Sequence, residues 1–97
     1  MRIFAKRTLR EFWENNPEAE KPLQAWHKEV EAENWTSPHD LKARYSNASI
    51  IGDNRAVFRI RQGRYRLVAR INYDAGLVFI RFIGTHAQYD KIDAETI

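Results

Sequence analysis

Three side chains that can exchange or orient protons lie close together near the end of the sequence. His86, Tyr89 and Asp90 follow a candidate helix cap, Thr85, at spacings that can place all three on one side of a single helical turn. An imidazole can act as a general base or a general acid near neutral pH, and a phenol or a carboxylate can orient it or share the work. This turn is the first candidate for proton-transfer chemistry.

The segment before this turn is rich in arginine. Residues 55–81 contain seven arginines and one acidic residue, Asp74. A planar guanidinium can donate two parallel hydrogen bonds to phosphate oxygens. Cleavage of RNA by its own 2′-hydroxyl requires that the hydroxyl lose a proton, that the charge developing at phosphorus be stabilised, and that the 5′-oxygen gain a proton. Arginines beside a histidine could meet these requirements.

A hairpin would gather the arginines on one face of a sheet. Gln62-Gly63 separates two alternating runs and suits a two-residue loop. That register places Phe58 opposite Leu67 and Arg59 opposite Arg66, so that apolar side chains share one face and arginines share the other. Facing arginines repel each other, which a stability argument does not explain but a polyanionic partner does. The alternative is a solvated face that happens to use arginine.

A second turn at Asp74-Ala75 adds a third strand. A two-residue loop, or a four-residue loop in the same register, pairs Ile71 with Val78 and Leu67 with Phe82. Arg81 then lies opposite Val68. The arginine face is expected to carry Arg59, Arg61, Arg64, Arg66, Arg70, Phe79 and Arg81.

The elements before the hairpin are predicted to form its scaffold. Helical spacing of apolar residues predicts helices over 6–16 and 22–34, with Pro22 as the first residue of the second. Ser37 and the proline after it predict the start of a short helix ending near residue 45, and 46–54 is expected to be a loop. The buried stripes are expected to include Leu9, Phe12, Trp13, Leu23, Trp26 and Val30. The prediction is a single α+β domain over residues 1–97. Its N-terminal strand and two helices pack on one face of a twisted antiparallel sheet, and a short helical turn lies near the C-terminus.

Composition excludes several other classes of protein. The chain has no cysteine, and its three histidines (His27, His39 and His86) are dispersed, so no metal site or cofactor is expected. His27 and His39 are expected to be structural. No apolar run approaches the roughly 20 residues of a membrane span, and the absence of cysteine and of a secretory signal fits the cytoplasm.

Several segments resemble the HigB-type toxins of bacterial toxin–antitoxin pairs, within the wider RelE/ParE-like group. The resemblance rests on the order of the elements, on Asp40-Leu41-Lys42, on the run from Tyr65 to Ala69, and above all on residues 79–90. In that last segment the spacing Ile-Arg-x-x-x-Thr-His-x-x-Tyr-Asp is typical of the HigB branch.

The resemblance implies a RelE-like fold and an mRNA interferase, a ribosome-dependent endoribonuclease that cuts messenger without a metal and stops translation in the cytoplasm. It also implies a HigA-like helix-turn-helix antitoxin, bound in a heterotetramer. The catalytic roles would fall to Arg61, Arg66, Arg81, His86 and Tyr89, with the identity of the general base left open. RNA contacts are expected from Arg59, Arg64, Arg70, Lys42 and Lys91.

Two other functions fit the same sequence features. A ParE-type inhibitor of DNA gyrase has the same fold and needs no histidine–tyrosine turn. A non-catalytic RNA-binding module would bind RNA with strong salt dependence and produce no cut ends. The arginine face could also receive an acidic segment of an antitoxin, which is compatible with the nuclease hypothesis.

Overall fold

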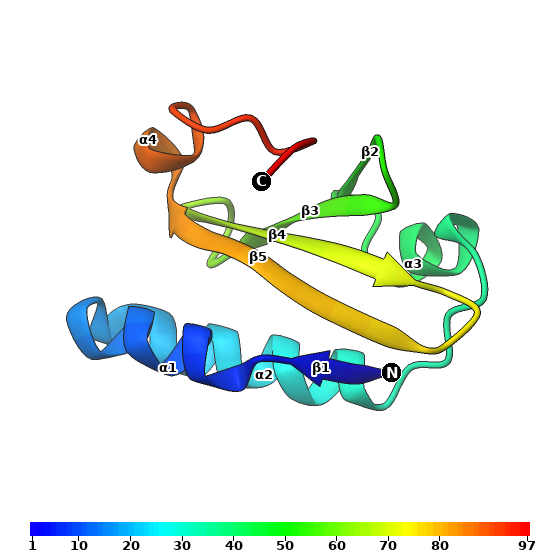
Figure 1. Cartoon of the computed structure of the whole chain (residues 1–97). Coiled ribbons are helices and arrows are strands. Elements are labelled where there is room, and N and C mark those ends of the chain that lie inside the picture. The colour runs from blue at the N-terminus through cyan, green and yellow to red at the C-terminus, as the bar shows by residue number, and fades with distance from the viewer.

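The computed structural model describes residues 1–97 as a five-stranded sheet with two long helices on one face (Figure 1). The strand order is β1-β5-β4-β3-β2. In chain order the elements are β1 (Arg2–Phe4), α1 (Lys6–Asn15), the 3-10 helix η1 (Pro17–Ala19), α2 (Glu20–Glu31), α3 (Pro38–Arg44), β2 (Ser49–Ile51), β3 (Arg55–Ile60), β4 (Tyr65–Asn72), β5 (Leu77–Thr85) and α4 (His86–Tyr89). The predicted α+β fold is confirmed. None of its helices has both the length and the apolar character needed to cross a bilayer.

The sheet is mixed rather than purely antiparallel. β1 joins it as an edge strand, parallel to β5, whereas every other pairing is antiparallel. The region 46–54, predicted as a loop, contains β2, which pairs with β3. Asp53 and Asn54 both have a φ of 57°, a conformation that asparagine and aspartate tolerate better than most residues, and this allows the tight turn between β2 and β3.

The predicted helices are present, with two local differences. α2 begins at Glu20, so Pro22 is its third residue, where a missing N–H breaks no intrahelical hydrogen bond. Ser37 precedes α3 as predicted, but its side chain makes no capping bond. The Asp40 carboxylate accepts hydrogen bonds from the Thr36 N–H and hydroxyl instead, and these bonds lower the pKa of Asp40.

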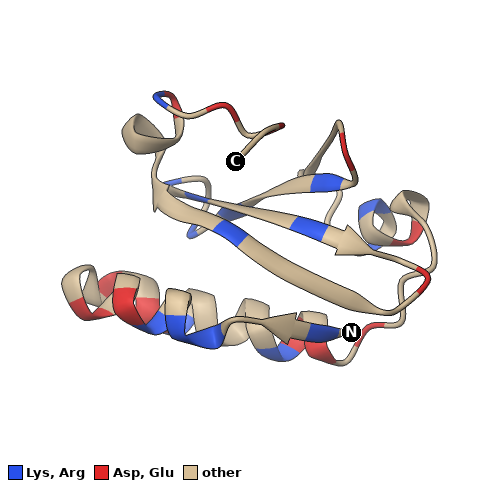
Figure 2. Cartoon of the chain, viewed as in Figure 1, with Lys and Arg blue, Asp and Glu red and all other residues tan.

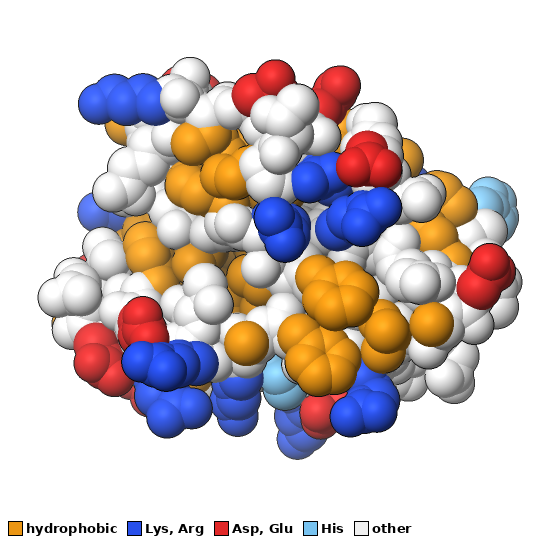
Figure 3. Space-filling view, in the orientation of Figure 1, with side chains coloured by type: hydrophobic (Ala, Val, Ile, Leu, Met, Phe, Trp, Pro, Cys, Tyr) orange, Lys and Arg blue, Asp and Glu red, His pale blue; other side chains and the backbone are white.

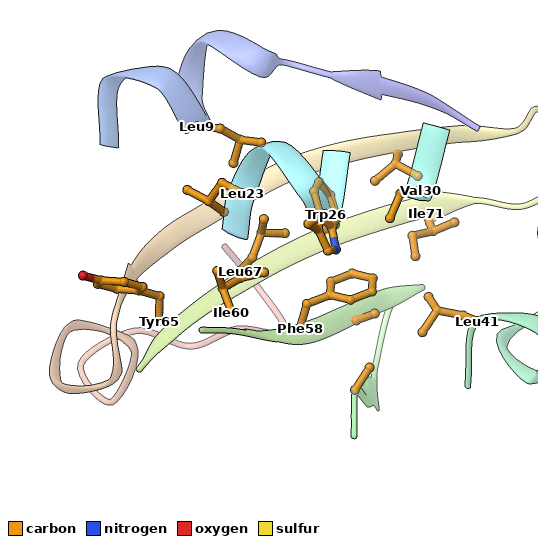
Figure 4. Close-up of a cluster of buried hydrophobic side chains, with 14 of the residues drawn as sticks. Leu9, Leu23, Trp26, Val30, Leu41, Phe58, Ile60, Tyr65, Leu67 and Ile71 are labelled. Atoms are coloured by element: carbon orange, nitrogen blue, oxygen red, sulfur yellow. The ribbon is translucent and has the colours of Figure 1, made fainter. Parts of the chain in front are cut away.

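One cluster of 16 buried residues joins the helices to the sheet (Figure 4). Phe58 lies among three other aromatic rings, with centroids 5.3 Å from Trp26, 6.3 Å from Trp35 and 5.4 Å from Tyr45. The predicted stripe residues Leu9, Leu23, Trp26 and Val30 are buried in this cluster, and Phe12 and Trp13 pack against it.

The β3–β4 hairpin has the predicted register. Phe58 opposes Leu67, Arg59 opposes Arg66, and Ile60 opposes Tyr65. The turn spans residues 61–64 rather than two residues, and a hydrogen bond from the Arg64 N–H to the Arg61 carbonyl closes it. Positive φ values at Arg61, Gln62 and Gly63 keep this longer turn compact.

The β4–β5 register holds for part of its length and then shifts. Ile71 opposes Val78 as predicted, but a β-bulge between Val68 and Ala69 moves the later pairs by one residue. Phe82 therefore opposes Val68 and Ile83 opposes Leu67, so the predicted core pair of Leu67 with Phe82 is wrong. Ile83 takes the core position, and Arg81 is the extra residue that has no partner on β4.

Candidate nucleic-acid interface

The sheet face opposite α1 and α2, here called the outer face, carries two arginine bands separated by an apolar band. Figure 2 shows basic positions spaced along β3, β4 and β5. Across the strands, the first band consists of Phe79, Arg70 and Arg55, the apolar band of Phe82, Val68 and Val57, and the last band of Gly84, Arg66 and Arg59. The predicted arginine face therefore exists, but it is divided.

The C-terminal segment, residues 90–97, covers part of this face. It returns from α4 across the sheet toward β3 (Figure 1). Val57 and Val68 are only 4% and 0% exposed, although they face away from the main core cluster and do not belong to it. The middle of the outer face is therefore covered, whereas the sequence alone predicts a face that is open to an anionic partner.

Arg55, Arg70 and Arg81 form the first arginine cluster. Arg55 is the only buried charged residue, at 6% exposure. The Asp53 carboxylate binds its Nη1 at 2.7 Å and lies 3.5 Å from Arg70 Nη2. The hydrogen bond from Arg55 and the charge of Arg70 lower the pKa of Asp53. Arg81 forms no ion pair with an aspartate or a glutamate; its Nε–H donates to the main-chain oxygen of Ile97.

Arg59 and Arg66 form the second cluster, at the hairpin end of the sheet. The Arg66 guanidinium donates to the Gly63 carbonyl. A Cβ on residue 63 would lie 3.1 Å from Arg66 Nη1, so the glycine makes room for this contact. Neither arginine has a carboxylate partner, which leaves their charges available to an anionic ligand. Figure 3 shows basic side chains that gather near the centre of the molecule, beside an apolar patch.

Arg61 and Arg64 turn toward the helical layer. Their guanidinium groups lie 3.7 Å and 3.4 Å from the carboxylate of Glu18 in η1, which also accepts a 2.8 Å hydrogen bond from the Tyr65 hydroxyl. Two facing arginine pairs are thus each bridged by one carboxylate: Asp53 joins Arg55 to Arg70, and Glu18 joins Arg61 to Arg64. The expectation that only an external polyanion offsets the repulsion holds for Arg59 and Arg66 alone.

We expect the Glu18 contacts to make stability depend on acid pH. The hydrogen bond from Tyr65 and the charges of Arg64 and Arg61 lower the pKa of Glu18. A lowered carboxyl pKa stabilises the folded state above the unfolded-state value of about 4.3, and this contribution is lost as the pH falls through the folded-state pKa. The free energy of unfolding of Glu18→Gln, measured by urea denaturation at a series of pH values below about 4.3, should therefore fall less steeply with falling pH than that of the unmodified chain.

Glu14→Gln is the control, because Glu14 is exposed and forms no ion pair. Its free energy of unfolding should depend on pH as that of the unmodified chain does. Equal pH dependence for the two variants would contradict the role of Glu18.

The His86 turn has the predicted local geometry. Thr85 and Gln88 cap α4 reciprocally, with Thr85 N–H to Gln88 Oε1 at 2.8 Å and Gln88 N–H to Thr85 Oγ1 at 3.1 Å. The His86 N–H donates to the Arg64 carbonyl at 3.2 Å, which fixes α4 to the hairpin. His86 Nδ1 lies 3.3 Å from Asp90 Oδ2, and the two side chains are 56% and 59% exposed. The imidazole is therefore oriented by a carboxylate and open to a ligand.

The remaining predicted residues are more scattered. The Lys42 ammonium donates to the main-chain oxygens of Ser46 and Ala48, both at 2.7 Å, and so holds the loop before β2. Lys91 is exposed at the rim of a groove between α1 and α4 that Phe82 and Ile92 also line. Tyr89 is half-buried in α4. RNA contacts by Lys42 and Lys91 stay predictions.

Sequence reasoning missed two partners in this interface. Arg55 was not among the predicted site residues, although the confirmed register places it directly opposite Arg70, so the signal was available. The main-chain oxygen of Ile97, which contacts Arg55 and Arg81, had no signal in the sequence.

The compact α+β arrangement, with its five-stranded mixed sheet, is consistent with a small RelE-like fold. A family model described as HigB_toxin, the RelE-like toxic component of a toxin-antitoxin system, matches residues 19–92. The chain therefore belongs to the HigB toxin family, and the resemblance seen in the sequence is confirmed. This membership suggests that the chain has an antitoxin partner. A search of curated proteins found no match.

Proposed function

We propose that this toxin is an mRNA interferase, an endoribonuclease that cuts messenger on the ribosome in the cytoplasm and thereby inhibits translation. A HigA-like helix-turn-helix antitoxin would neutralise it in a heterotetramer. The observation that carries the proposal is the exposed His86–Asp90 pair, fixed to the end of a sheet on which three arginines have no aspartate or glutamate partner. A gyrase inhibitor would need no such oriented imidazole.

The proposed reaction uses the 2′-hydroxyl of the messenger as its nucleophile. The 2′-oxygen attacks the adjacent phosphorus while the bond from phosphorus to the 5′-oxygen breaks, giving a 2′,3′-cyclic phosphate and a 5′-hydroxyl. One side chain takes the proton of the 2′-hydroxyl and another gives a proton to the 5′-oxygen. His86 serves in one of these steps, Tyr89 is the candidate for the other, and Asp90 orients the imidazole.

The arginines would stabilise the charge that develops on the phosphate oxygens. Arg66 is the first of three arginines proposed to be catalytic. It lies on β4 opposite Gly84, two residues before His86. Arg81 projects onto the same face from the bulge, and Arg61 lies in the turn between β3 and β4. Arg59, Arg64 and Arg70 are proposed to contact neighbouring phosphates, so affinity for RNA should fall steeply as salt rises.

The test is to replace His86 and map cut messenger ends. Removal of a general acid or base slows a reaction by about 100- to 10,000-fold, so His86→Ala should abolish growth arrest and the mapped cleavage ends in cells. His39→Ala is the matched control, because His39 is exposed on α3, and it should retain full toxicity. Undiminished cleavage by His86→Ala would refute the proposed role of the imidazole. Growth arrest with DNA damage and intact translation would favour the gyrase inhibitor.

A further inference from the structure

We propose that Arg55 and Arg81 together form a binding site for one phosphate group of the RNA, and that the main-chain oxygen of Ile97 occupies this site in the free protein. RNA would then have to displace residues 93–97 in order to bind. This inference rests on the proposed function, because it identifies a subsite for the same RNA substrate, and it adds Arg55 as a binding residue.

Convergence of donors on a single oxygen defines the site. The Nε–H of Arg55 and the Nε–H of Arg81 reach the Ile97 oxygen at 3.1 Å and 3.2 Å, and Arg55 Nη2 donates to the same atom. These groups come from β3 and β5, which are separated by β4. Two planar guanidinium groups that meet at one oxygen form the arrangement by which arginine recognises a phosphate oxygen. The Ile97 oxygen therefore stands in for an oxygen of the ligand.

Burial and an ion pair hold Arg55 in position. Its side chain is 6% exposed, and Asp53 binds Nη1 at 2.7 Å, which leaves Nε and Nη2 directed at the Ile97 oxygen. A guanidinium that is already fixed loses little conformational entropy when it binds a ligand. The site is thus organised before RNA arrives, and Arg81, which is exposed, completes it from the bulge in β5.

The segment that fills the site is held mainly by a local turn. Asp93 accepts hydrogen bonds from Glu95 N–H at its Oδ1 and from Thr96 N–H and Ile97 N–H at its carbonyl, with distances of 3.1 Å, 3.2 Å and 3.1 Å. None of these bonds involves the sheet, so residues 93–97 can move away without breaking a strand pairing. A phosphate group of RNA offers two anionic oxygens to the two planar guanidinium groups, whereas a single oxygen of Ile97 receives their hydrogen bonds in the free protein. RNA can therefore replace the segment.

Nuclear magnetic resonance of the arginine Nε–Hε groups tests this site directly. The full chain is titrated with a 2′-O-methyl tetranucleotide, which binds but cannot be cleaved because it lacks the free 2′-hydroxyl. The Hε signals of Arg55 and Arg81 and the amide signal of Ile97 should shift together with one Kd, while the Hε signal of Arg10 on α1 stays unchanged. A parallel titration with inorganic phosphate separates a general anion site from an RNA subsite. Shifts with phosphate alone would overturn the proposal.

A variant of the turn at residues 93–97 tests whether this segment competes with RNA for the site. Asp93→Gly removes the carboxylate that accepts the Glu95 N–H and loosens the turn. If the segment occupies the site most of the time, freeing it should lower the Kd of the tetranucleotide by about three- to tenfold. Asp74→Gly is the matched control: it removes one negative charge from the β4–β5 turn and should leave the Kd close to that of the unmodified chain. Equal affinity for all three proteins would overturn the displacement step.

The outcomes separate this inference from the proposed nuclease activity. If the oligonucleotide shifts the Arg55, Arg81 and Ile97 signals but messenger is never cut, the phosphate subsite stands and the nuclease proposal fails. If messenger is cut in a His86-dependent way while these three signals do not respond to the oligonucleotide, the nuclease proposal stands and the subsite is refuted. Absence of any oligonucleotide binding also refutes the subsite.

Discussion

Replacing Arg81 with alanine is expected to slow messenger cleavage by about 100- to 1,000-fold, the usual cost of removing one preorganised donor that stabilises transition-state charge. Arg81 suits this role because it projects onto the outer face from a bulge, has no aspartate or glutamate partner, and already directs its Nε–H at an oxygen atom. Its removal should not unfold the protein, since the side chain is exposed. Cleavage of a ribosome-bound messenger, measured with purified toxin, gives the rate.

Two further variants make the Arg81 result interpretable. Arg81→Lys keeps the positive charge but lacks the planar fork, so it should recover only part of the lost rate. Arg10→Ala removes an exposed arginine from α1, on the opposite side of the sheet, and should leave the rate unchanged. A slow rate for Arg10→Ala would mean that net charge alone determines cleavage, and a normal rate for Arg81→Ala would exclude Arg81 from the reaction.

Phe58→Ala is expected to destabilise the fold by about 3–5 kcal/mol, because it removes a fully buried ring and leaves a cavity. Phe58 is 1% exposed. Its ring contacts Trp26 on α2, Trp35 before α3 and Tyr45 after α3, so a smaller side chain would remove the contact among three parts of the core. Urea denaturation followed by tryptophan fluorescence measures the change.

A second phenylalanine provides the control for this prediction. Phe4 is 40% exposed at the sheet edge, where it stacks on Phe79, and Phe4→Ala should cost about 1 kcal/mol or less. Similar losses for the two variants would show that the core is not organised around Phe58.

The hairpin register could be predicted from the sequence, whereas the bulge could not. On β3 and β4 the apolar residues and arginines alternate on both strands, and only one register sorts both at once. On β5 the neighbours Phe82 and Ile83 are both apolar, so either can fill the core position without violating the pattern. Three-dimensional packing decides between them: Ile83 enters the core and Phe82 lies on the outer face.

The candidate site was predictable where it depends on local spacing. His86 and Asp90 are four residues apart, and one helical turn brings them together whatever the rest of the fold does. The partners of the arginines are remote in sequence: Glu18 lies on η1 and Ile97 on the C-terminal segment. No periodicity or motif connects these positions to the sheet, so neither contact could be inferred before the structure.

The bulge in β5 makes the outer face sensitive to the length of that strand. One additional residue between Ile80 and Phe82 allows Arg81 to project onto the same side as Phe79 and Phe82. Deletion of Arg81 would remove the bulge but keep Ile80 opposite Ala69 and Phe82 opposite Val68, so the core face would stay in phase and only the arginine would be lost. The bulge therefore adds one ligand-facing side chain to β5 without changing which of the later residues face the core.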